Sequence, residues 1–311
     1  MNSIIVTGAN SGIGFQCAVQ LAKDAPDNQI ILACRNRKAG NDAAAAIQQK
    51  TGHRFVKCLP LDLSSFESIK EFKDIISGDK YNKIDALFNN AGMQNVNKTQ
   101  YTKDGIELTF GVNHLGPFYL TLLLLPFFSE NSGITFTASG THDPHQKTGI
   151  APPVYINAHL LAHPKEENEK LSIIGQRRYS TSKLCNILTT YELFKRLRDS
   201  TVRVNAFDPG MVPGTGLART YPPVLRFLWK YLLPVFTVFQ RNTNTAYRSG
   251  KNLASVGYSL AFRAFSGKYF EGLKEIESSE DSYNSEYQID LWKTSVALTG
   301  IKQEETIVDL A

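Results

Sequence analysis

The sequence predicts a doubly wound α/β fold, with a parallel sheet of about seven strands and helices on both of its faces. Short apolar runs of strand length alternate along the chain with helical patterns, which is typical of βαβ units. Parallel strands joined in this way cross over right-handed, and few topologies other than the doubly wound sheet satisfy that rule. Because 311 residues suit one large domain, we expect residues 1–311 to form a single domain.

The expected strands are short runs rich in Val, Ile and other apolar side chains. They are residues 3–7, 29–34, 54–60, 84–88, 133–138, 202–207 and 267–270. Helical patterns fill most of the gaps between them. Residues 38–50 combine Ala, Gln and Lys with an apolar stripe, and a further helix is expected over residues 65–76, with Leu63-Ser64 as its predicted N-cap.

Two segments, residues 141–178 and 210–240, interrupt this alternation. Both follow strand ends at the edge where open α/β sheets bind their ligands, so we expect the 141–178 insert and the 210–240 cap to form the substrate walls. Residues 222–239 are apolar and aromatic, but Arg226, Lys230 and Pro234 interrupt them, which argues against a membrane span. Two interpretations stay open for this stretch: a lid over an apolar pocket, or a peripheral contact with a membrane surface.

Charge and leader patterns bear on partners and location. The net charge of +5 is mild and the basic residues are spread along the chain, so nucleic-acid binding is not expected. The N-terminus runs directly into an apolar strand, without the basic and long apolar regions of a signal peptide. We therefore expect a cytoplasmic protein, with membrane association at most peripheral.

Cysteine and histidine spacing predicts no metal. The cysteines show neither a C-x-x-C pair nor ligand spacing, which favours reduced thiols; they are Cys17, Cys34, Cys58 and Cys185. Five polar residues of the insert are candidate ligands: His142, Asp143, His145, His159 and His163. Such side chains are usually solvated or line a pocket, so no metal site is expected.

A glycine-rich turn, T-G-A-N-S-G-I-G, lies between the first strand and the helix after it. Gly8, Gly12 and Gly14 permit a tight turn, which lets the N–H groups around Asn10, Ser11 and Ile13 approach a pyrophosphate at the positive end of the helix. In this strand–turn–helix setting the motif predicts dinucleotide binding by a Rossmann-type fold.

The end of the second strand indicates which dinucleotide is bound. An NAD enzyme would hold a carboxylate here against the ribose hydroxyls, but the chain reads Ala33-Cys34-Arg35-Asn36-Arg37. The guanidinium of Arg35 suits a 2′-phosphate, which favours NADP(H) over NAD. The alternative is that Arg35 and Arg37 are ordinary surface cations.

A Y-x-x-x-K pair, Tyr179 and Lys183, is the candidate proton-transfer pair. Residues four apart share one face of a helix, so the phenol and the ammonium can point into one site. A unit charge at ~4 Å in an effective dielectric of ~20 contributes ~4 kcal/mol. We therefore expect Lys183, helped by an oxidised nicotinamide, to draw the pKa of Tyr179 from about 10 towards neutrality, where a general acid works best.

Taken together, these motifs resemble the short-chain dehydrogenase/reductase family over nearly the whole chain. The resemblance implies catalytic roles for Asn113, Ser139, Tyr179 and Lys183. The expected cofactor-binding residues in the glycine turn are Gly8, Asn10, Ser11, Gly12, Ile13 and Gly14, and the 2′-phosphate is assigned to Arg35. Asp62, with Leu63, is the expected adenine contact, and Asn90, Ala91 and Gly92 come from the N-N-A-G element. The remaining expected contacts are Tyr179, Lys183, Pro209, Gly210 and, at the nicotinamide, Thr215.

Within the family, the chain is most similar to the branch of light-dependent protochlorophyllide reductases and retinol-type dehydrogenases. The similarity lies in residues 33–37, 104–116, 179–186 and 214–217, although the 141–178 insert matches neither subgroup closely. The resemblance implies an NADPH-dependent oxidoreductase that transfers hydride to a carbonyl or activated double bond of a bulky apolar substrate, with Tyr179 as proton donor. Ser139 would donate a hydrogen bond to the developing oxyanion. Asn113 would anchor a water in a proton relay from Lys183.

Several alternatives stay open. The protein is also interpretable as a protochlorophyllide reductase-type photoenzyme, or as an NADP-binding redox sensor without turnover. Substrate, reaction direction and oligomeric state are undecided. In particular, the apolar helix around residues 115–128 belongs either to the core or to a dimer face.

Overall fold

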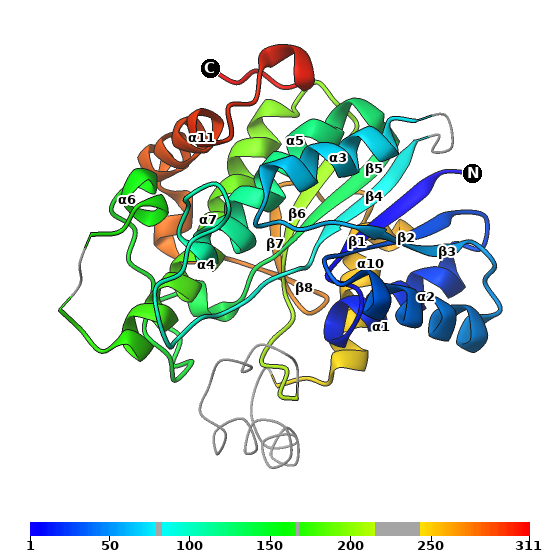
Figure 1. The fold of residues 1–311 in the computed structure, drawn as a ribbon, viewed down its shortest axis with the longest axis horizontal. Helices are drawn as coiled ribbons and strands as arrows, with labels where there is room; N and C mark the ends of the chain where they lie inside the picture. Colours follow the sequence, from blue (N-terminus) through cyan, green and yellow to red (C-terminus); the bar gives the residue numbers. More distant parts are fainter. Residues whose placement is uncertain (79–82, 166–167, 215–242) are drawn as a thin grey trace.

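In the computed structural model, which describes residues 1–78, 83–165, 168–214 and 243–311, the strands form one eight-stranded sheet (Figure 1). The order across the sheet is β3-β2-β1-β4-β5-β6-β7-β8. All neighbours run parallel except β7 and β8, which are antiparallel. The bounds are β1 Ser3–Thr7, β2 Gln29–Cys34, β3 Val56–Pro60, β4 Ile84–Asn89, β5 Phe128–Thr137, β6 Arg203–Asp208, β7 Lys268–Glu271 and β8 Lys274–Ile276.

The strand order confirms the doubly wound topology. The chain moves outward from β1 through β2 to β3, then returns to place β4 on the other side of β1 and continues outward to β7. The reversal lies between β1 and β4, and the carboxyl ends of the strands around such a switch point form the ligand crevice of an open α/β sheet. The candidate site residues follow these same strand ends.

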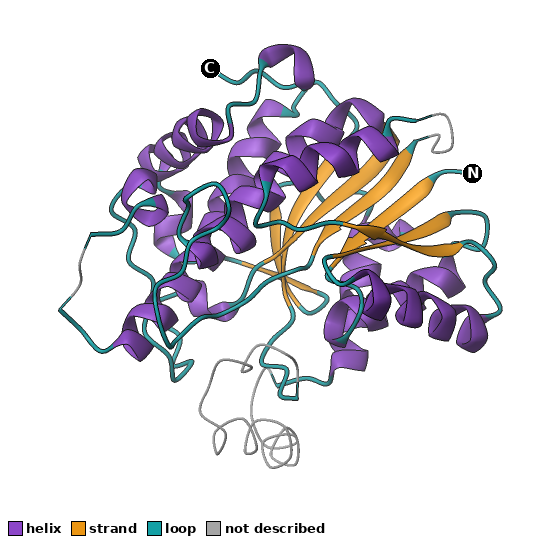
Figure 2. Ribbon diagram, in the orientation of Figure 1, coloured by secondary structure: helices purple, strands orange, loops and turns teal. Residues whose placement is uncertain are grey.

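Helices cover both faces of the sheet (Figure 2). One face carries α1 Gly12–Asp24, α2 Arg37–Thr51 and α10 Ala246–Tyr258. The other carries α3 Phe66–Ile76, α5 Gly116–Leu124, α7 Leu171–Arg196 and α11 Ser285–Thr299. Two shorter helices, α4 Leu108–Phe110 and α6 Ala158–Ala162, lie on the way to α5 and α7.

The core divides into two layers because successive side chains of a strand point to opposite faces. On β1, Ile4 and Val6 join the cluster beneath α1, α2 and α10, whereas Ile5 joins the cluster beneath α3, α5 and α7. All three are fully buried. The continuous apolar run that predicted this strand therefore serves both layers, as parallel strands covered on two faces do.

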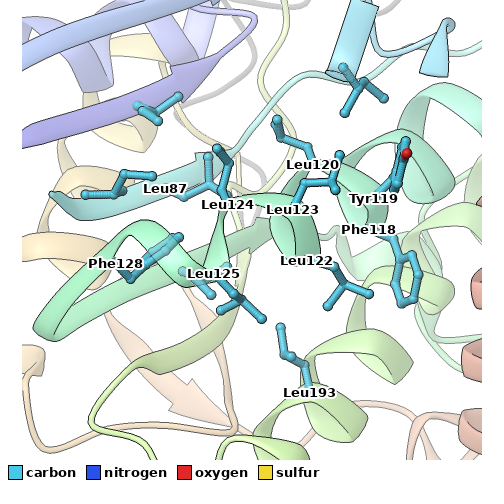
Figure 3. Packing of buried hydrophobic residues seen from close by; sticks show 14 of the residues in the cluster. Leu87, Phe118, Tyr119, Leu120, Leu122, Leu123, Leu124, Leu125, Phe128 and Leu193 are labelled. Carbon is cyan, nitrogen blue, oxygen red and sulfur yellow. The ribbon is translucent and has the colours of Figure 1, made fainter. Parts of the chain in front are cut away.

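Helix α5 is a core helix. Every one of its residues is buried, and Figure 3 shows it between Leu87 of β4 and Leu193 of α7. In the part of the chain that the structure describes, the stretch Leu108–Phe127 has the length and hydropathy of a membrane span, but 89% of its apolar 18-residue window is buried inside the protein. Helix α11 covers it further, since the Trp292 and Phe118 rings meet edge to face at 5.1 Å. Of the two interpretations left open for residues 115–128, the structure supports the core.

Some predicted boundaries were wrong. Helix α3 begins at Phe66 and its N-cap is Ser65, whose Oγ accepts a hydrogen bond from Ser68 N; Ser64, expected in the cap, instead donates to Asp62 Oδ1 at 2.6 Å. Strand β3 begins at Val56, two residues later than predicted, and β6 and β7 are each displaced by one residue towards the C-terminus.

The larger differences are at β5, β8 and α7. Strand β5 begins at Phe128, five residues earlier than predicted, because the polar stretch before Gly133 continues pairing to β4 through a register shift. Strand β8 was missed because its three residues are exposed or half-buried and carry no apolar pattern. Helix α7 begins at Leu171, so the last eight residues of the 141–178 insert are helical.

Candidate active site

The turn between β1 and α1 is closed by glycines that no other residue can replace without strain. Gly8 and Gly12 have φ of +65° and +59°, in the left-handed region that favours glycine. A Cβ on Gly14 would lie 2.5 Å from Asn90 Nδ2 and 2.9 Å from Gly8 O. The three predicted glycines therefore bring the N-terminus of α1 tightly against the end of β1.

Thr7 joins this turn to the end of β4. Its Oγ accepts hydrogen bonds from Asn90 N at 3.0 Å and Ala91 N at 2.9 Å, and Asn90 Nδ2 donates to Thr7 O at 2.9 Å. The N-cap residue Ser11 is exposed and makes no side-chain capping bond, so its hydroxyl does not occupy the N–H groups of the first turn. This arrangement fits an anion at the positive end of α1.

The residues predicted to contact the adenosine half lie at the ends of β2 and β3. Arg35 follows β2 and is exposed, while Asn36 caps α2 by accepting a hydrogen bond from Ala39 N at 3.0 Å. Asp62 follows β3, and its Oδ1 accepts from Ser64 N at 3.0 Å. Leu63 is buried beneath it. Because β2 and β3 are neighbours, Arg35 and Asp62 lie on the same edge of the sheet.

Tyr179 and Lys183 lie on one face of α7, as their spacing predicts. Lys183 Nζ is 5.6 Å from the centre of the Tyr179 ring and donates a hydrogen bond to Thr137 O at 2.8 Å. That carbonyl ends β5, and Ser139 follows two residues later with its Oγ accepting from Thr141 N at 3.3 Å. Burial lowers the pKa of Lys183 to about 8, against the opposing effect of the Asp208 carboxylate.

Asn113 lies in a π-helical turn, Gly111–Leu115, between α4 and α5. Its Oδ1 accepts from Met93 N and its Nδ2 donates to Met93 O, both at 2.8 Å, and Nδ2 also donates to Ser182 Oγ at 2.9 Å. A Cβ on Gly92 would lie 3.5 Å from both Asn113 Oδ1 and Lys183 Nζ. These are ordinary van der Waals distances, and they show that the loop after β4, the π-turn and α7 meet at Gly92.

Close packing also fixes the segment before Tyr179. A Cβ on Gly175 would lie 2.1 Å from Asn95 O and 2.7 Å from the Cα of Val96. Gly175 is one turn before Tyr179 on the same face of α7. The loop after β4 thus rests directly on the backbone of the helix that carries the candidate proton donor.

The Pro-Gly element after β6 lies at the same edge. Gly210 has φ of +74°, and Pro209 O accepts hydrogen bonds from Ser249 Oγ at 2.7 Å and Asn244 Nδ2 at 3.1 Å. These bonds tie the turn to α10. Thr215, the stretch 222–239 and most of the expected 210–240 cap lie outside the described residues.

The first part of the 141–178 insert borders the Tyr179 face of α7, and the next part lies elsewhere. Ser180 Oγ donates to Ala151 O at 2.7 Å, which places that carbonyl beside the helix position next to Tyr179. Thr181 Oγ accepts from Val154 N at 3.0 Å, and Thr181 is about 200° around the helix from Tyr179. Tyr155 OH then donates to Asp290 Oδ2 of α11 at 2.7 Å.

The histidines of the insert do not converge. His142 is buried against Ser139 and Ser279, whereas the His159 and His163 rings lie 5.1 Å apart at α6. Within the described ranges no three His, Cys, Asp or Glu side chains are grouped as metal ligands.

The chain is similar to proteins of one family over almost its whole length. The family model described as short chain dehydrogenase matches residues 2–150. Human retinol dehydrogenase 13 is 36% identical over 308 residues, which cover 96% of this chain and 85% of that protein. The chain belongs to the short-chain dehydrogenase/reductase family. Mouse retinol dehydrogenase 12, 32% identical over 309 residues that cover 97% of this chain and 87% of its own length, places it in the retinol dehydrogenase-like branch.

Solved structures share the fold of this short-chain dehydrogenase/reductase. A short-chain dehydrogenase from Shigella flexneri complexed with NADP has a TM-score of 0.61 at 20% identity, with 86% of this chain and 95% of that chain covered. Family membership makes the protein an oxidoreductase that uses a nicotinamide cofactor and a small-molecule substrate. The glycine cradle at β1 and α1 fits such a cofactor.

Two buried side chains at this site were not assigned to it from the sequence, since Asp208 was not singled out and His142 was considered only as a metal ligand. Asp208, at the end of β6, accepts from Gly210 N at 2.8 Å. His142, three residues after Ser139, donates through Nδ1 to Ser139 O at 2.7 Å and accepts from Ser279 N at 3.0 Å. An acid directly before the Pro-Gly element was a usable signal for Asp208, whereas the role of His142 depends on the distant Ser279.

The π-turn makes stability depend on pH through His114. Its ring bonds to Ser295 Oγ at 3.0 Å, and burial lowers its pKa to about 3, far below the value of about 6.5 expected in the unfolded chain. The unfolded state therefore binds the proton more strongly, and stability present above pH 6.5 is lost as the pH falls. Between pH 7.5 and 5.5 we expect this histidine to remove about 1.4 kcal/mol from the free energy of unfolding.

Urea unfolding at the two pH values measures this change. In His114→Gln the loss on acidification should be smaller than in the natural protein by that amount. His145→Gln, at an exposed position in the insert, is the control and should leave the loss unchanged. An equal loss in the natural protein and His114→Gln would show that another group carries the pH dependence.

Proposed function

We propose that this short-chain dehydrogenase/reductase uses NADPH to reduce the carbonyl of a bulky apolar substrate, with Tyr179 as the proton donor. The observation that carries the proposal is the pairing of Tyr179 with the buried Lys183 ammonium on one face of α7, beside the end of β5 that carries Ser139. The crevice edge that holds this pair also holds the glycine turn. A hydride donor and a proton donor would thus share one site.

The cofactor half of the proposal assigns residues on five strand ends. The turn residues Asn10, Ser11 and Ile13 would offer N–H groups to the pyrophosphate, with Gly8, Gly12 and Gly14 giving it room. Arg35 would bind the 2′-phosphate, which NADP has and NAD lacks. The remaining contacts are assigned to Asp62, Leu63, Asn90, Ala91, Gly92, Tyr179, Lys183, Pro209, Gly210 and Thr215. NADPH, when bound, supplies the hydride.

The chain's own residues handle the proton. Tyr179 would donate it to the carbonyl oxygen, and the neighbouring Lys183 ammonium favours the phenolate that remains. Ser139 would donate a hydrogen bond to the same oxygen as negative charge develops there. Asn113 would anchor a water molecule in a proton relay that links Lys183 to solvent.

The substrate class is inferred from the relatives and from the insert. Both named relatives are retinol dehydrogenases, so a long, apolar aldehyde of the retinal type is the proposed substrate. Ala151, beside the Tyr179 face of α7, is assigned to the wall against which its chain lies. An apolar wall gains about 25 cal/mol for each Å² of apolar surface that it removes from water.

NADPH consumption by the purified protein tests the proposal. The panel contains retinal and other bulky apolar aldehydes and ketones, with protochlorophyllide in darkness and in light, and NADH as control. Turnover of an apolar carbonyl in darkness is expected. Turnover of protochlorophyllide only under illumination would instead indicate a photoenzyme. Tight NADPH binding without turnover of any substrate would indicate a redox sensor.

Arg35→Ala tests the choice of cofactor. The side chain is exposed and no capping bond of α2 depends on it, since Asn36 makes that bond, so the fold should not change. Loss of a charge-assisted hydrogen bond of about 1.5 to 3 kcal/mol predicts NADPH binding weaker by about ten- to a hundredfold. Titration of both cofactors by fluorescence should show NADH binding almost unchanged, and equal losses for the two would remove Arg35 from the phosphate site.

A further inference from the structure

A buried carboxylate stands behind the proton-transfer pair. Asp208 is 1% exposed, at the last position of β6. Its Oδ1 accepts from Gly210 N at 2.8 Å, and its Oδ2 accepts from Tyr269 OH at 3.3 Å. An ionised carboxyl group in such a place is costly unless a positive charge and hydrogen bonds offset its loss of water.

The carboxylate faces the turn that carries Ser139. Ala138 N donates to Phe207 O at 2.8 Å, which aligns the end of β5 with the end of β6. A Cβ on Gly140 would lie 3.2 Å from Asp208 Oδ2. Glycine at position 140 therefore lets the backbone after Ser139 approach the carboxylate closely.

Lys183 is the buried cation of the same site. Its side chain is 3% exposed, and its Nζ donates to Thr137 O, the carbonyl two residues before Ser139. A neutral carbonyl offsets only part of the cost of burying an ammonium. The negative charge of Asp208 acts on Lys183 in the direction opposite to burial and raises its pKa.

Among the described residues, the other titratable groups around the pair are Tyr179 on α7, Tyr269 and Glu271 on β7, and His142 in the turn after β5, and none of these adds a positive charge. Burial and the Asp208 charge raise the pKa of Tyr269 well above its ordinary value, so this phenol stays neutral and donates. Burial lowers the pKa of His142, whose Nε2 accepts from Ser279 N, so that ring is neutral as well.

We propose that Asp208 is an electrostatic positioning residue of this site, whose buried carboxylate keeps the Lys183 side chain charged while Lys183 supports proton transfer at Tyr179. Tyr269 orients the carboxylate, and His142 packs its ring on Tyr269 at 4.9 Å while it holds Ser139 O. The catalytic part of this statement rests on the proposed function. The effect of Asp208 on Lys183 does not.

NMR of the cofactor-free protein labelled with 13C at lysine Cε tests the effect directly. The Lys183 resonance, assigned by its loss in Lys183→Arg, is followed from pH 6 to 11 in the natural protein and in Asp208→Asn. Loss of an opposite charge at this depth predicts a midpoint lower by about one pH unit or more in Asp208→Asn. Asp208→Ser is a second neutral variant and must shift the midpoint in the same direction.

Glu271→Gln is the matched control. Glu271 is the β7 partner of Asp208 in the sheet and carries the same charge, but it is only half-buried. Its replacement should leave the Lys183 midpoint within about 0.3 pH units, since exposed charges are screened by solvent. Equal midpoints in the natural protein and both neutral Asp208 variants would overturn the proposal. Absence of NADPH turnover by the natural protein would instead overturn the proposed function and leave the Lys183 titration unaffected.

Discussion

Tyr179→Phe is expected to retain NADPH binding while its turnover falls by about 10² to 10⁴-fold, the usual contribution of a general acid. The substitution removes one oxygen from a residue that is 7% exposed and keeps the ring that packs beside Lys183. The fold and the glycine cradle should therefore be unchanged. Stopped-flow rates of NADPH oxidation with an apolar aldehyde, together with a binding titration, measure the two quantities separately.

The same helix offers a matched control. Tyr191 lies three turns beyond Tyr179 in α7, is also buried, and its hydroxyl bonds to Ser278 Oγ at 2.6 Å, away from the Lys183 site. Tyr191→Phe removes the same atom from the same helix and should retain activity within about threefold, because no reacting group depends on it. A fully active Tyr179→Phe would exclude the proposed proton donor.

The fold was predictable because its strands can be recognised from their runs of apolar residues. Ile4, Ile5 and Val6 form an unbroken apolar run, which a strand buried on both faces requires. The crossover rule then left few arrangements of such strands. The apolar pattern did not predict β8, whose residues are exposed or half-buried, or the first two turns of α7. In α7, glycine stands at position 175 because the backbone at residue 95 approaches the helix there.

The residues of the candidate site were predictable where a local backbone conformation or a spacing along one helix requires a particular residue type. Gly8 must adopt a positive φ, and Tyr179 and Lys183 must share a helix face, so both patterns are visible in the sequence. Asp208 and the π-turn at Asn113 depend on which strand or loop lies beside them, and π-turns have no sequence signature of their own. Both features depend on contacts between residues far apart in the sequence, and the pattern of apolar residues along the chain does not predict such contacts.

Gly175→Ala is expected to lower both stability and turnover, although residue 175 belongs to none of the catalytic groups. The added Cβ would lie 2.1 Å from Asn95 O and 2.7 Å from the Cα of Val96, and both are backbone atoms that cannot rotate away. Relief requires α7 and the loop after β4 to separate. Overpacking of this kind costs about 1 to 3 kcal/mol, although the intrinsic helix preference of alanine offsets up to about 1 kcal/mol of it.

The loss of activity follows from what that loop holds. Met93 in the loop makes both backbone hydrogen bonds to the Asn113 side chain, and Asn113 in turn bonds to Ser182 beside Lys183. A displacement of about 1 Å at such a site can cost about a hundredfold in rate, so kcat should fall by that order in Gly175→Ala.

Urea unfolding measures the change in stability of Gly175→Ala, and NADPH oxidation measures the change in its turnover. Gly78→Ala is the control, because among the described residues its Cβ would meet nothing closer than Ile75 O at 3.4 Å, and it should change neither quantity. If Gly175→Ala kept both values, α7 and this loop would have to be further apart than the structure places them.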